Sequence, residues 1–313
     1  METSTPGQVY RVGDIVEVLS REEIRATLDK DGVCDGMPFM PEMWQYCGKR
    51  YRIYHTAEKV CVESTLLRQM RNTVFLDELR CDGSDHDGCD RDCLIFWKEA
   101  WLKKAEGPVE PPEGPLFTRP LPAHPKLDPN KTYSCQSTHL LTATEPLSRW
   151  ALRQYVRDVA SGNFTTIQVL RALLVVVYNR AARSLGWREF GTLRGTLSKT
   201  PVVALNLQPG EFVEVKSRDE IASTINTYSQ NRGLTIDYEM LRHSGRRFRV
   251  RRRVDRIILE TTGKMREINN TVLLEGNVCE GVCRRACSRA SFPMWREAWL
   301  KRVEDQASQV TAR

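Results

Sequence analysis

The sequence lacks long apolar runs and several motifs of familiar enzymes. No stretch approaches the roughly 20 consecutive apolar residues of a membrane-spanning helix, and the N-terminus lacks the basic, apolar and small-residue succession of a secretory signal. A Walker-type phosphate loop, a GxGxxG motif and an HExxH motif are also absent. Nucleotide hydrolysis and zinc-protease chemistry are therefore unsupported, and we expect a soluble, cytoplasmic protein without a transmembrane segment.

The residue that stands out instead is cysteine. The chain of 313 residues contains ten cysteines, and its 41% of apolar residues suffices for two modest domains. Cytosolic reductants keep thiols free, so the cysteines of an unsecreted protein are typically metal ligands or reactive groups rather than a disulfide framework. The cysteine clusters are therefore the first candidates for function.

The same series of motifs occurs twice along the chain. The offset between the two copies is 197 residues at first and 198 after one inserted residue, which indicates an internal duplication. The matching ranges are 13–18 with 210–215, 21–24 with 218–221, 47–53 with 244–250, 72–74 with 270–272 and 97–103 with 295–301.

Each copy has the pattern of a small β-barrel with a helical insertion. Residues 15–19 alternate like a strand, and Ser20 with Glu23 three residues later is typical of a helix start. Short β-type runs follow at 49–54, 73–79 and 100–104. These patterns predict an α+β protein with two SH3-like barrels.

The division of the chain follows from composition. The predicted parts are a first barrel at 10–106, a proline-rich linker at 107–131, a mainly helical connector at 132–207 and a second barrel at 208–304. Within the connector we expect one helix from Glu145 to about Ser161 and another from about Thr165 to Leu185. The second helix is expected to pack against both barrels, with attachment to a membrane surface as the alternative.

The first copy contains a complete candidate set of metal ligands. Three thiols and an imidazole form a CxxxxHxxCxxxC loop, in which Gly83 and Gly88 allow the backbone to curl around an ion. Cys61 could replace the imidazole and give four thiolates, the usual ligands of iron–sulfur centres. Zinc and an iron–sulfur cluster both remain open, with the ligands Cys81, Cys89 and Cys93 plus His86 or Cys61.

The second copy contains an incomplete set. Its CxxxCxxxC loop supplies Cys279, Cys283 and Cys287, and Ser291 aligns with Cys93. Because an incomplete ligand shell leaves a coordination position open, we expect the first site to be structural and the second to be accessible and reactive. The arginines around the second loop, namely Arg284, Arg285 and Arg289, should attract an anion, whereas five aspartates surround the first cluster.

Other interpretations of the cysteines are ordinary burial and a reversible disulfide. Core burial fits Cys34 and Cys47, and a disulfide could join Cys89 to Cys93. Cys135 lies four residues before His139, which could activate its thiol, although a structural role is the better interpretation.

The charge distribution bears on the partner. Residues 10–106 carry a net charge of −4, whereas 107–207 and 208–304 carry +6 each. We therefore expect an anionic small molecule or a protein as the partner of the second copy. A nucleic-acid-binding module, using an arginine-rich strand at Arg247, Arg249, Arg251 and Arg253, ranks lower because the first copy is acidic. A zinc-stabilised scaffold is the other alternative.

These motifs carry one resemblance. Gly-Asp-x-Val-Glu-Val at 13–18, Cys-Gly-Lys-Arg-Tyr-Arg at 47–52, the loop at 81–93 and Trp-Lys-Glu-Ala-Trp-Leu-Lys at 97–103 resemble a bacterial family with a duplicated, cysteine-containing small barrel. The resemblance covers nearly the whole chain, including 133–138 and 153–158, and implies no particular activity. The second copy lacks counterparts of Cys93 and Cys47, so the resemblance does not imply that the two sites have the same function.

Overall fold

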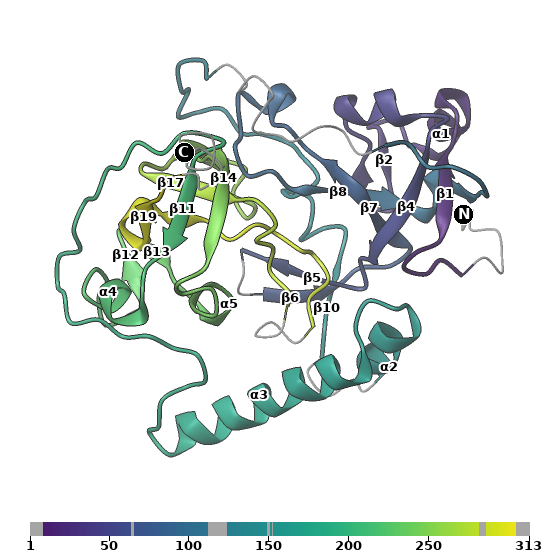
Figure 1. Cartoon of the computed structure of the whole chain (residues 1–313). Coiled ribbons are helices and arrows are strands. Elements are labelled where there is room, and N and C mark those ends of the chain that lie inside the picture. The colour runs from purple at the N-terminus through teal and green to yellow at the C-terminus, as the bar shows by residue number, and fades with distance from the viewer. Residues whose placement is uncertain are drawn as a thin grey trace, which may run out of the picture.

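A computed structural model describes residues 9–63, 66–111, 124–148, 151, 153–281 and 286–304. Short strands and a few helices alternate along the chain, and the expected α+β class fits this architecture. Two five-stranded antiparallel sheets lie on opposite sides of the molecule, with a three-stranded sheet between them (Figure 1). Among the described residues, no helix combines the length and the apolarity needed to cross a bilayer.

The N-terminal segment, residues 10–106, forms the first five-stranded sheet. The strand order is β8 (Leu94–Lys98), β7 (Thr73–Arg80), β4 (Arg50–Thr56), β1 (Ile15–Val18) and β9 (Leu102–Lys104). The helix α1 (Arg21–Thr27) begins after Ser20, whose side chain and backbone exchange hydrogen bonds with Glu23, as predicted. Smaller elements are β2 (Val33–Cys34), β3 (Met37–Pro38), η1 (Pro41–Tyr46), η2 (Ser84–His86) and η3 (Glu99–Trp101).

The C-terminal segment, residues 208–304, forms the second five-stranded sheet. Its order is β18 (Trp295–Arg296), β17 (Thr271–Leu274), β14 (Arg247–Arg253), β11 (Phe212–Val215) and β19 (Leu300–Arg302), which follows the first sheet position by position. The helix α4 (Arg218–Ala222) has the same kind of capping box, between Ser217 and Glu220. Smaller elements are β12 (Gln230–Asn231), β13 (Leu234–Thr235), α5 (Tyr238–Leu241), β15 (Arg256–Ile258), β16 (Met265–Glu267) and η6 (Glu297–Trp299).

Each five-stranded sheet encloses its own hydrophobic core. Trp97 and Trp101 are fully buried in the first core, and Trp295 and Trp299 are fully buried in the second. The strand predicted at 100–104 starts later, at Leu102, because η3 turns Trp101 into the core. Burial of these indole rings therefore decides where the last strand of the sheet begins.

The helix predicted from Glu145 is wrong at its start. Glu145 and Pro146 form β10, which pairs with β6 (Leu66–Gln69), and β6 pairs in turn with β5 (Lys59–Val62). The helix α2 (Arg153–Ala160) begins only at Arg153. Pairing with a strand more than 70 residues earlier outweighs the local helix signal. The helix α3 (Thr166–Ser184), with Thr165 as its N-cap, agrees with the prediction.

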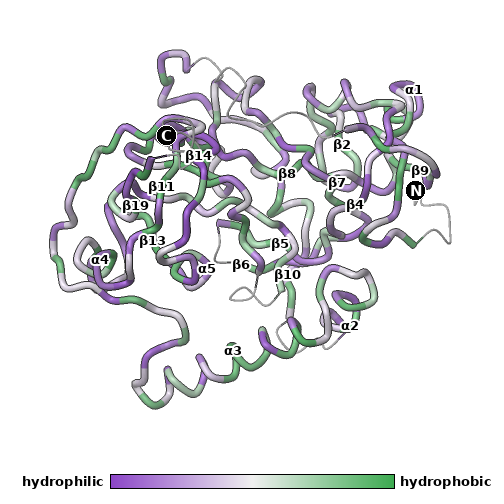
Figure 2. The backbone as a smooth tube through the Cα atoms, viewed as in Figure 1, coloured by the Kyte–Doolittle hydropathy of each residue, from purple (hydrophilic) through white to green (hydrophobic). Residues whose placement is uncertain are grey.

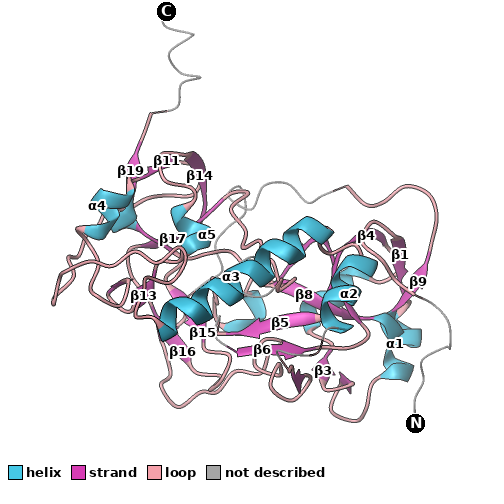
Figure 3. Cartoon of the chain, turned by 90° about the horizontal axis from the view of Figure 1, so that it is seen from below, coloured by secondary structure: helices cyan, strands magenta, loops and turns pink. Residues whose placement is uncertain are grey.

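The α2–α3 pair contacts both segments, and α2 makes the ionic contact with the N-terminal segment. Asp158 of α2 forms a buried ion pair with Lys59 of β5, and burial raises the pKa of Asp158 to about 7. Tyr155, Phe164 and Val169 pack with Ala286 of the C-terminal segment. The helix α3 runs along one side of the molecule (Figures 2 and 3). Its other side exposes the apolar side chains of Ile167, Leu170, Leu174, Val177 and Tyr178.

Candidate metal centres

The two cysteine clusters lie on loops with the same backbone hydrogen bonds. One loop joins β7 to β8, and the other joins β17 to β18. The Cys81 N–H donates to the Cys93 carbonyl at 2.9 Å, and the Cys279 N–H donates to the Ser291 carbonyl at 2.9 Å. The aligned positions therefore close both loops in the same way.

A glycine is required at the same place in both loops. Gly83 and Gly281 have φ angles of 82° and 71°, in the left-handed region that glycine favours. A Cβ atom at Gly83 would overlap the carbonyl oxygen of Cys89, and one at Gly281 would overlap that of Cys287. Each glycine thus lets the chain fold back onto a cysteine of its own cluster.

The first cluster gathers four thiols around one small cavity. Cys81, Cys89 and Cys93, the thiols of the predicted ligand set, line a cavity of about 40 Å³, and Cys135 of the connector joins them. Burial raises the pKa of Cys81 well above its usual value and that of Cys89 to about 12, and the nearby thiols add to both shifts. Burial also raises the pKa of Cys135. Without a cation, the thiols of Cys81, Cys89 and Cys135 would be neutral.

A histidine and a carboxyl group complete the lining of this cavity. The ligand atoms of Glu42, Cys81 and His86 all lie within 4.8 Å of one another. His86 Nδ1 lies 3.9 Å from Cys81 Sγ, while its buried Nε2 has no partner among the described residues. Burial lowers the pKa of His86 and raises that of Glu42 to about 7. A neutral imidazole beside the thiols is suited to metal binding.

Cys61 lies with the second cluster rather than the first. Its Sγ atom is 3.2 Å from the Sγ atom of Cys287. Cys61, Cys279 and Cys287 line a second, larger cavity of about 710 Å³, which Cys93 also reaches from the other side. Cys283, the remaining thiol of the predicted set, lies outside the described residues. Burial raises the pKa of Cys279, and the hydrogen bond with Cys61 followed by burial raises that of Cys287.

Two of the five aspartates that surround the first cluster are buried. Asp90 is 1% exposed and its Oδ1 lies 3.1 Å from a nitrogen of Arg252; Asp92 is 2% exposed and its Oδ2 lies 2.6 Å from Arg251 Nε. Their partners belong to the C-terminal segment. The aspartates therefore anchor the two segments to each other rather than coating the cluster with solvent-exposed charge.

Of the three arginines expected around the second loop, the structure describes Arg289, which is paired within the protein. Arg289 is buried and its Nη2 lies 2.6 Å from a carboxylate oxygen of Glu260. Arg284 and Arg285 lie outside the described residues. In the predicted arginine strand, β14, Arg253 pairs with Glu297 at 3.4 Å, and the pairing register shifts between Val250 and Arg252. The simple alternation expected along this strand is therefore interrupted.

The other cysteines lie in separate surroundings. Cys34 and Cys47 pack against the first hydrophobic core, as expected for core residues. The ring of His139 is 2.9 Å from the Ser134 hydroxyl, so this contact directs the imidazole to Ser134. Cys135 was the ligand candidate that sequence reasoning underrated, because it lies 42 residues beyond the cluster it joins.

Comparison with known proteins leaves the site to be interpreted from its own geometry. No protein-family model, curated protein or solved structure matches the chain. The described residues contain one further grouping of potential metal ligands, formed by Asp90, His124 and Asp255. Protein contacts account for its central carboxylate, because Asp90 also accepts the backbone N–H groups of Asp255 and Arg256. The candidate centres are therefore the two thiol clusters.

Proposed function

We propose that the chain is a metal- or iron–sulfur-binding protein with two thiolate centres. The first centre is structural and uses Cys81, Cys89, Cys93 and Cys135, with His86 as the alternative donor. The second uses Cys61, Cys279 and Cys287, and it is the more reactive one because three thiolates leave a coordination position open. One observation carries the proposal: three thiols of one loop and a fourth from 42 residues further along the chain line one small cavity.

The chemistry of the first cavity supports this function. The thiols of Cys81, Cys89 and Cys135, whose pKa values are raised, gain little from lying together as neutral groups. A soft metal displaces their protons and couples its binding free energy to folding. Four thiolates suit both structural zinc and an iron–sulfur cluster. A zinc-stabilised scaffold is the second candidate function, favoured by the small volume of this cavity.

The wider architecture is proposed in the same terms. We infer that the two segments are copies of one SH3-like barrel, joined by the linker at 107–131 and the connector at 132–207. The identical order of the two five-stranded sheets and the matched loop hydrogen bonds support this inference. A reducing compartment such as the cytoplasm would keep the thiols available for metal.

Metal analysis of anaerobically purified protein tests the function. Wild type should contain metal, and Cys135→Ser should lose the content of one centre, whereas the core variant Cys34→Ser should retain it all. Visible absorption together with acid-labile sulfide indicates an iron–sulfur cluster, and zinc without visible absorption indicates the scaffold. Full metal content in Cys135→Ser, or none in wild type, would contradict the proposal.

A further inference from the structure

Cys61 reaches the second cluster from the opposite segment. It lies on β5 of the N-terminal segment, 226 residues before Cys287 in sequence, yet the two Sγ atoms are 3.2 Å apart. Two hydrogen bonds between the segments flank this pair of thiols. The Ser288 N–H donates to the Lys59 carbonyl at 3.2 Å, and Arg289 Nη1 donates to the Cys61 carbonyl at 2.7 Å.

The aligned position in the other segment explains the different fourth thiols. Residue 258 corresponds to Cys61, and Ile258 lines the small cavity of the first cluster. An isoleucine cannot ligate a metal there, and Cys135 supplies the additional thiol instead. The second cluster has Ser291 where the first has Cys93, and it gains a thiol from Cys61. Each cluster is thus completed by a cysteine from outside its own loop.

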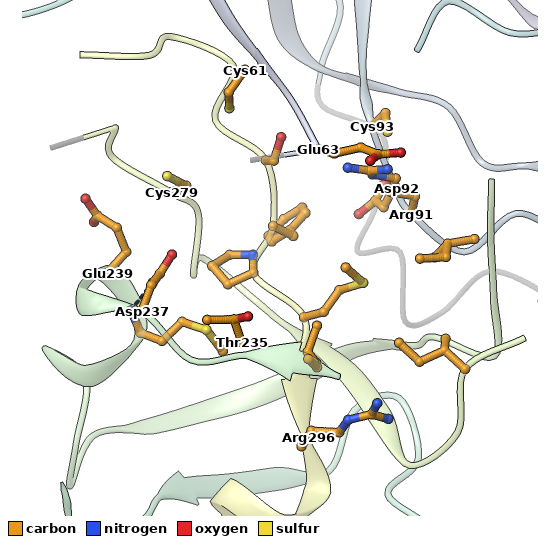
Figure 4. A pocket seen from close by; sticks show the side chains of 18 of the residues that line it. Cys61, Glu63, Arg91, Asp92, Cys93, Thr235, Asp237, Glu239, Cys279 and Arg296 are labelled. Carbon is orange, nitrogen blue, oxygen red and sulfur yellow. Dashed lines mark hydrogen bonds between the residues drawn. The ribbon is translucent and has the colours of Figure 1, made fainter. Parts of the chain in front are cut away.

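The second cluster opens onto the large cavity between the segments. In Figure 4, Cys61 and Cys279 lie on one side of this cavity, and Cys93 and Arg91 lie on the other. Apolar side chains form part of its lining, including Ile257, Leu259, Phe292 and Met294. A volume of about 710 Å³ is within the usual range for a small-molecule site.

The charges around the cavity favour an anionic ligand. Of the five carboxylates that line it, three are paired with arginines, in the pairs Asp92–Arg251, Glu239–Arg242 and Glu267–Arg256. The other two, Glu63 and Asp237, accept hydrogen bonds from Thr261 and from the Met240 N–H. In contrast, Arg232, Arg266 and Arg296 have no carboxylate partner among the described residues. Arg296 is only 7% exposed, and its guanidinium donates to carbonyl groups and the Thr271 hydroxyl. A buried cation without a counter-charge favours an anion nearby.

We propose that Cys61, Cys279 and Cys287 form a metal centre shared by the two segments, and that the adjoining cavity binds a small organic anion with an apolar body. The inference rests on the proposed function, since it assigns the ligands and the ligand class of the second centre. Three thiolates leave a coordination position open toward the cavity. The arginines hold the charge of the ligand, and the apolar lining contacts its body.

Metal content of single variants tests the shared centre. Cys61→Ser and Cys279→Ser should each lose the metal of the second centre and retain that of the first. Cys135→Ser should lose only the metal of the first centre. The Cys61→Ser/Cys135→Ser variant should lose the metal of both centres, and Cys47→Ser should lose neither. Wild-type content in Cys61→Ser would overturn the shared centre while leaving the first centre intact. Unchanged content in Cys135→Ser with a loss in Cys61→Ser would instead contradict the first centre.

Thiol cross-linking checks the juxtaposition independently of metal content. In chelator-treated full-length protein, diamide should take two electrons and two protons from Cys61 and Cys287, join their sulfurs in a disulfide and become the corresponding hydrazine. Peptide mass analysis should find this link in chelated protein and much less of it in metal-loaded protein. Failure to form it in chelated wild type, with the fold intact by circular dichroism, would overturn the pairing.

Binding of 1-anilinonaphthalene-8-sulfonate tests the ligand class in metal-loaded protein. Its sulfonate and aromatic rings match the cavity, and Arg232→Gln/Arg266→Gln should weaken binding about fivefold. Arg218→Gln, an exposed control on α4, should leave binding unchanged. Benzoate should displace the probe, and inorganic phosphate should do so far less well. The organic-anion assignment would be overturned if phosphate displaced the probe as well as benzoate does. It would also be overturned if the wild type did not bind the probe, or if the double variant bound it as tightly as the wild type.

Discussion

The first cysteine loop is completed by Cys135 of the connector, whereas the second is completed by Cys61 of the opposite segment. The two loops nevertheless close with the same hydrogen bonds and turn at equivalent glycines. The difference between them therefore comes from the side chains that pack against a common backbone. The same loop geometry can place four thiols around a small cavity or three thiols along the lining of a large one.

The anchoring of the two loops differs in the same manner. The Asp90 carboxylate fastens the first loop by contacts with Arg252 and two backbone N–H groups. At the aligned position, Ser288 fastens the second loop by neutral hydrogen bonds to the carbonyls of Thr56 and Lys59. The first anchor is ionic and buried, so its loss should cost more.

Removing each anchor gives the largest expected contrast. Asp90→Ala should lower the free energy of unfolding by about 4 kcal/mol, because Arg252 would remain buried without its counter-charge. Ser288→Ala should lower it by about 1 kcal/mol, the usual value of a neutral hydrogen bond. Urea unfolding of both variants measures the difference. Equal losses would show that the two loops are anchored alike.

The glycine requirement of the loops gives the next largest effect. Gly83→Ala should destabilise the protein by about 3 kcal/mol, because the new Cβ combines an unfavourable φ angle with overlap of the Cys89 carbonyl. Gly48 is the matched control: its φ angle is 75°, and a Cβ there meets nothing within 4 Å. Gly48→Ala should cost only about 1 kcal/mol. Thermal unfolding compares them, and similar costs would remove the steric argument.

A pair of aligned glutamates gives the smallest effect. Burial followed by the charge of Glu58 raises the pKa of Glu99 to about 7, so its folded state binds a proton more tightly than the unfolded chain. This contribution to stability is present below about pH 4.5 and is lost as the pH rises to about 7. Glu99→Gln should therefore stabilise the protein by about 1 kcal/mol at pH 8. The gain should vanish at pH 4.

Glu297 provides the control for this pH experiment. It is fully buried, but its carboxylate accepts the backbone N–H groups of Leu205, Asn206 and Leu207. Glu297→Gln should therefore destabilise the protein at pH 8, by about 2 kcal/mol. Chemical unfolding across the pH range measures both variants. If both substitutions changed the free energy of unfolding at pH 8 in the same direction, the surroundings of Glu99 and Glu297 would be equivalent.

Local sequence patterns predicted the parts of the fold that local interactions determine. The capping boxes at Ser20 and Thr165 satisfy backbone groups within three residues, so both helix starts were predictable. The strand at Glu145 was missed because its partner β6 lies far back along the chain. The same limitation applies to the site: spacing predicted the first three thiols, while tertiary packing alone brought Cys135 to them and Cys61 to Cys287.

The reciprocal contacts between the segments have a consequence for assembly. In the first loop, the backbone N–H of Asp90 donates a hydrogen bond to the Arg256 carbonyl. In the second loop, the backbone N–H of Ser288 donates to the Lys59 carbonyl, at the equivalent position. Each segment thus supplies a backbone carbonyl to the cysteine loop of the other segment. Because both segments belong to one chain, these contacts are intramolecular, and they should not depend on the protein concentration.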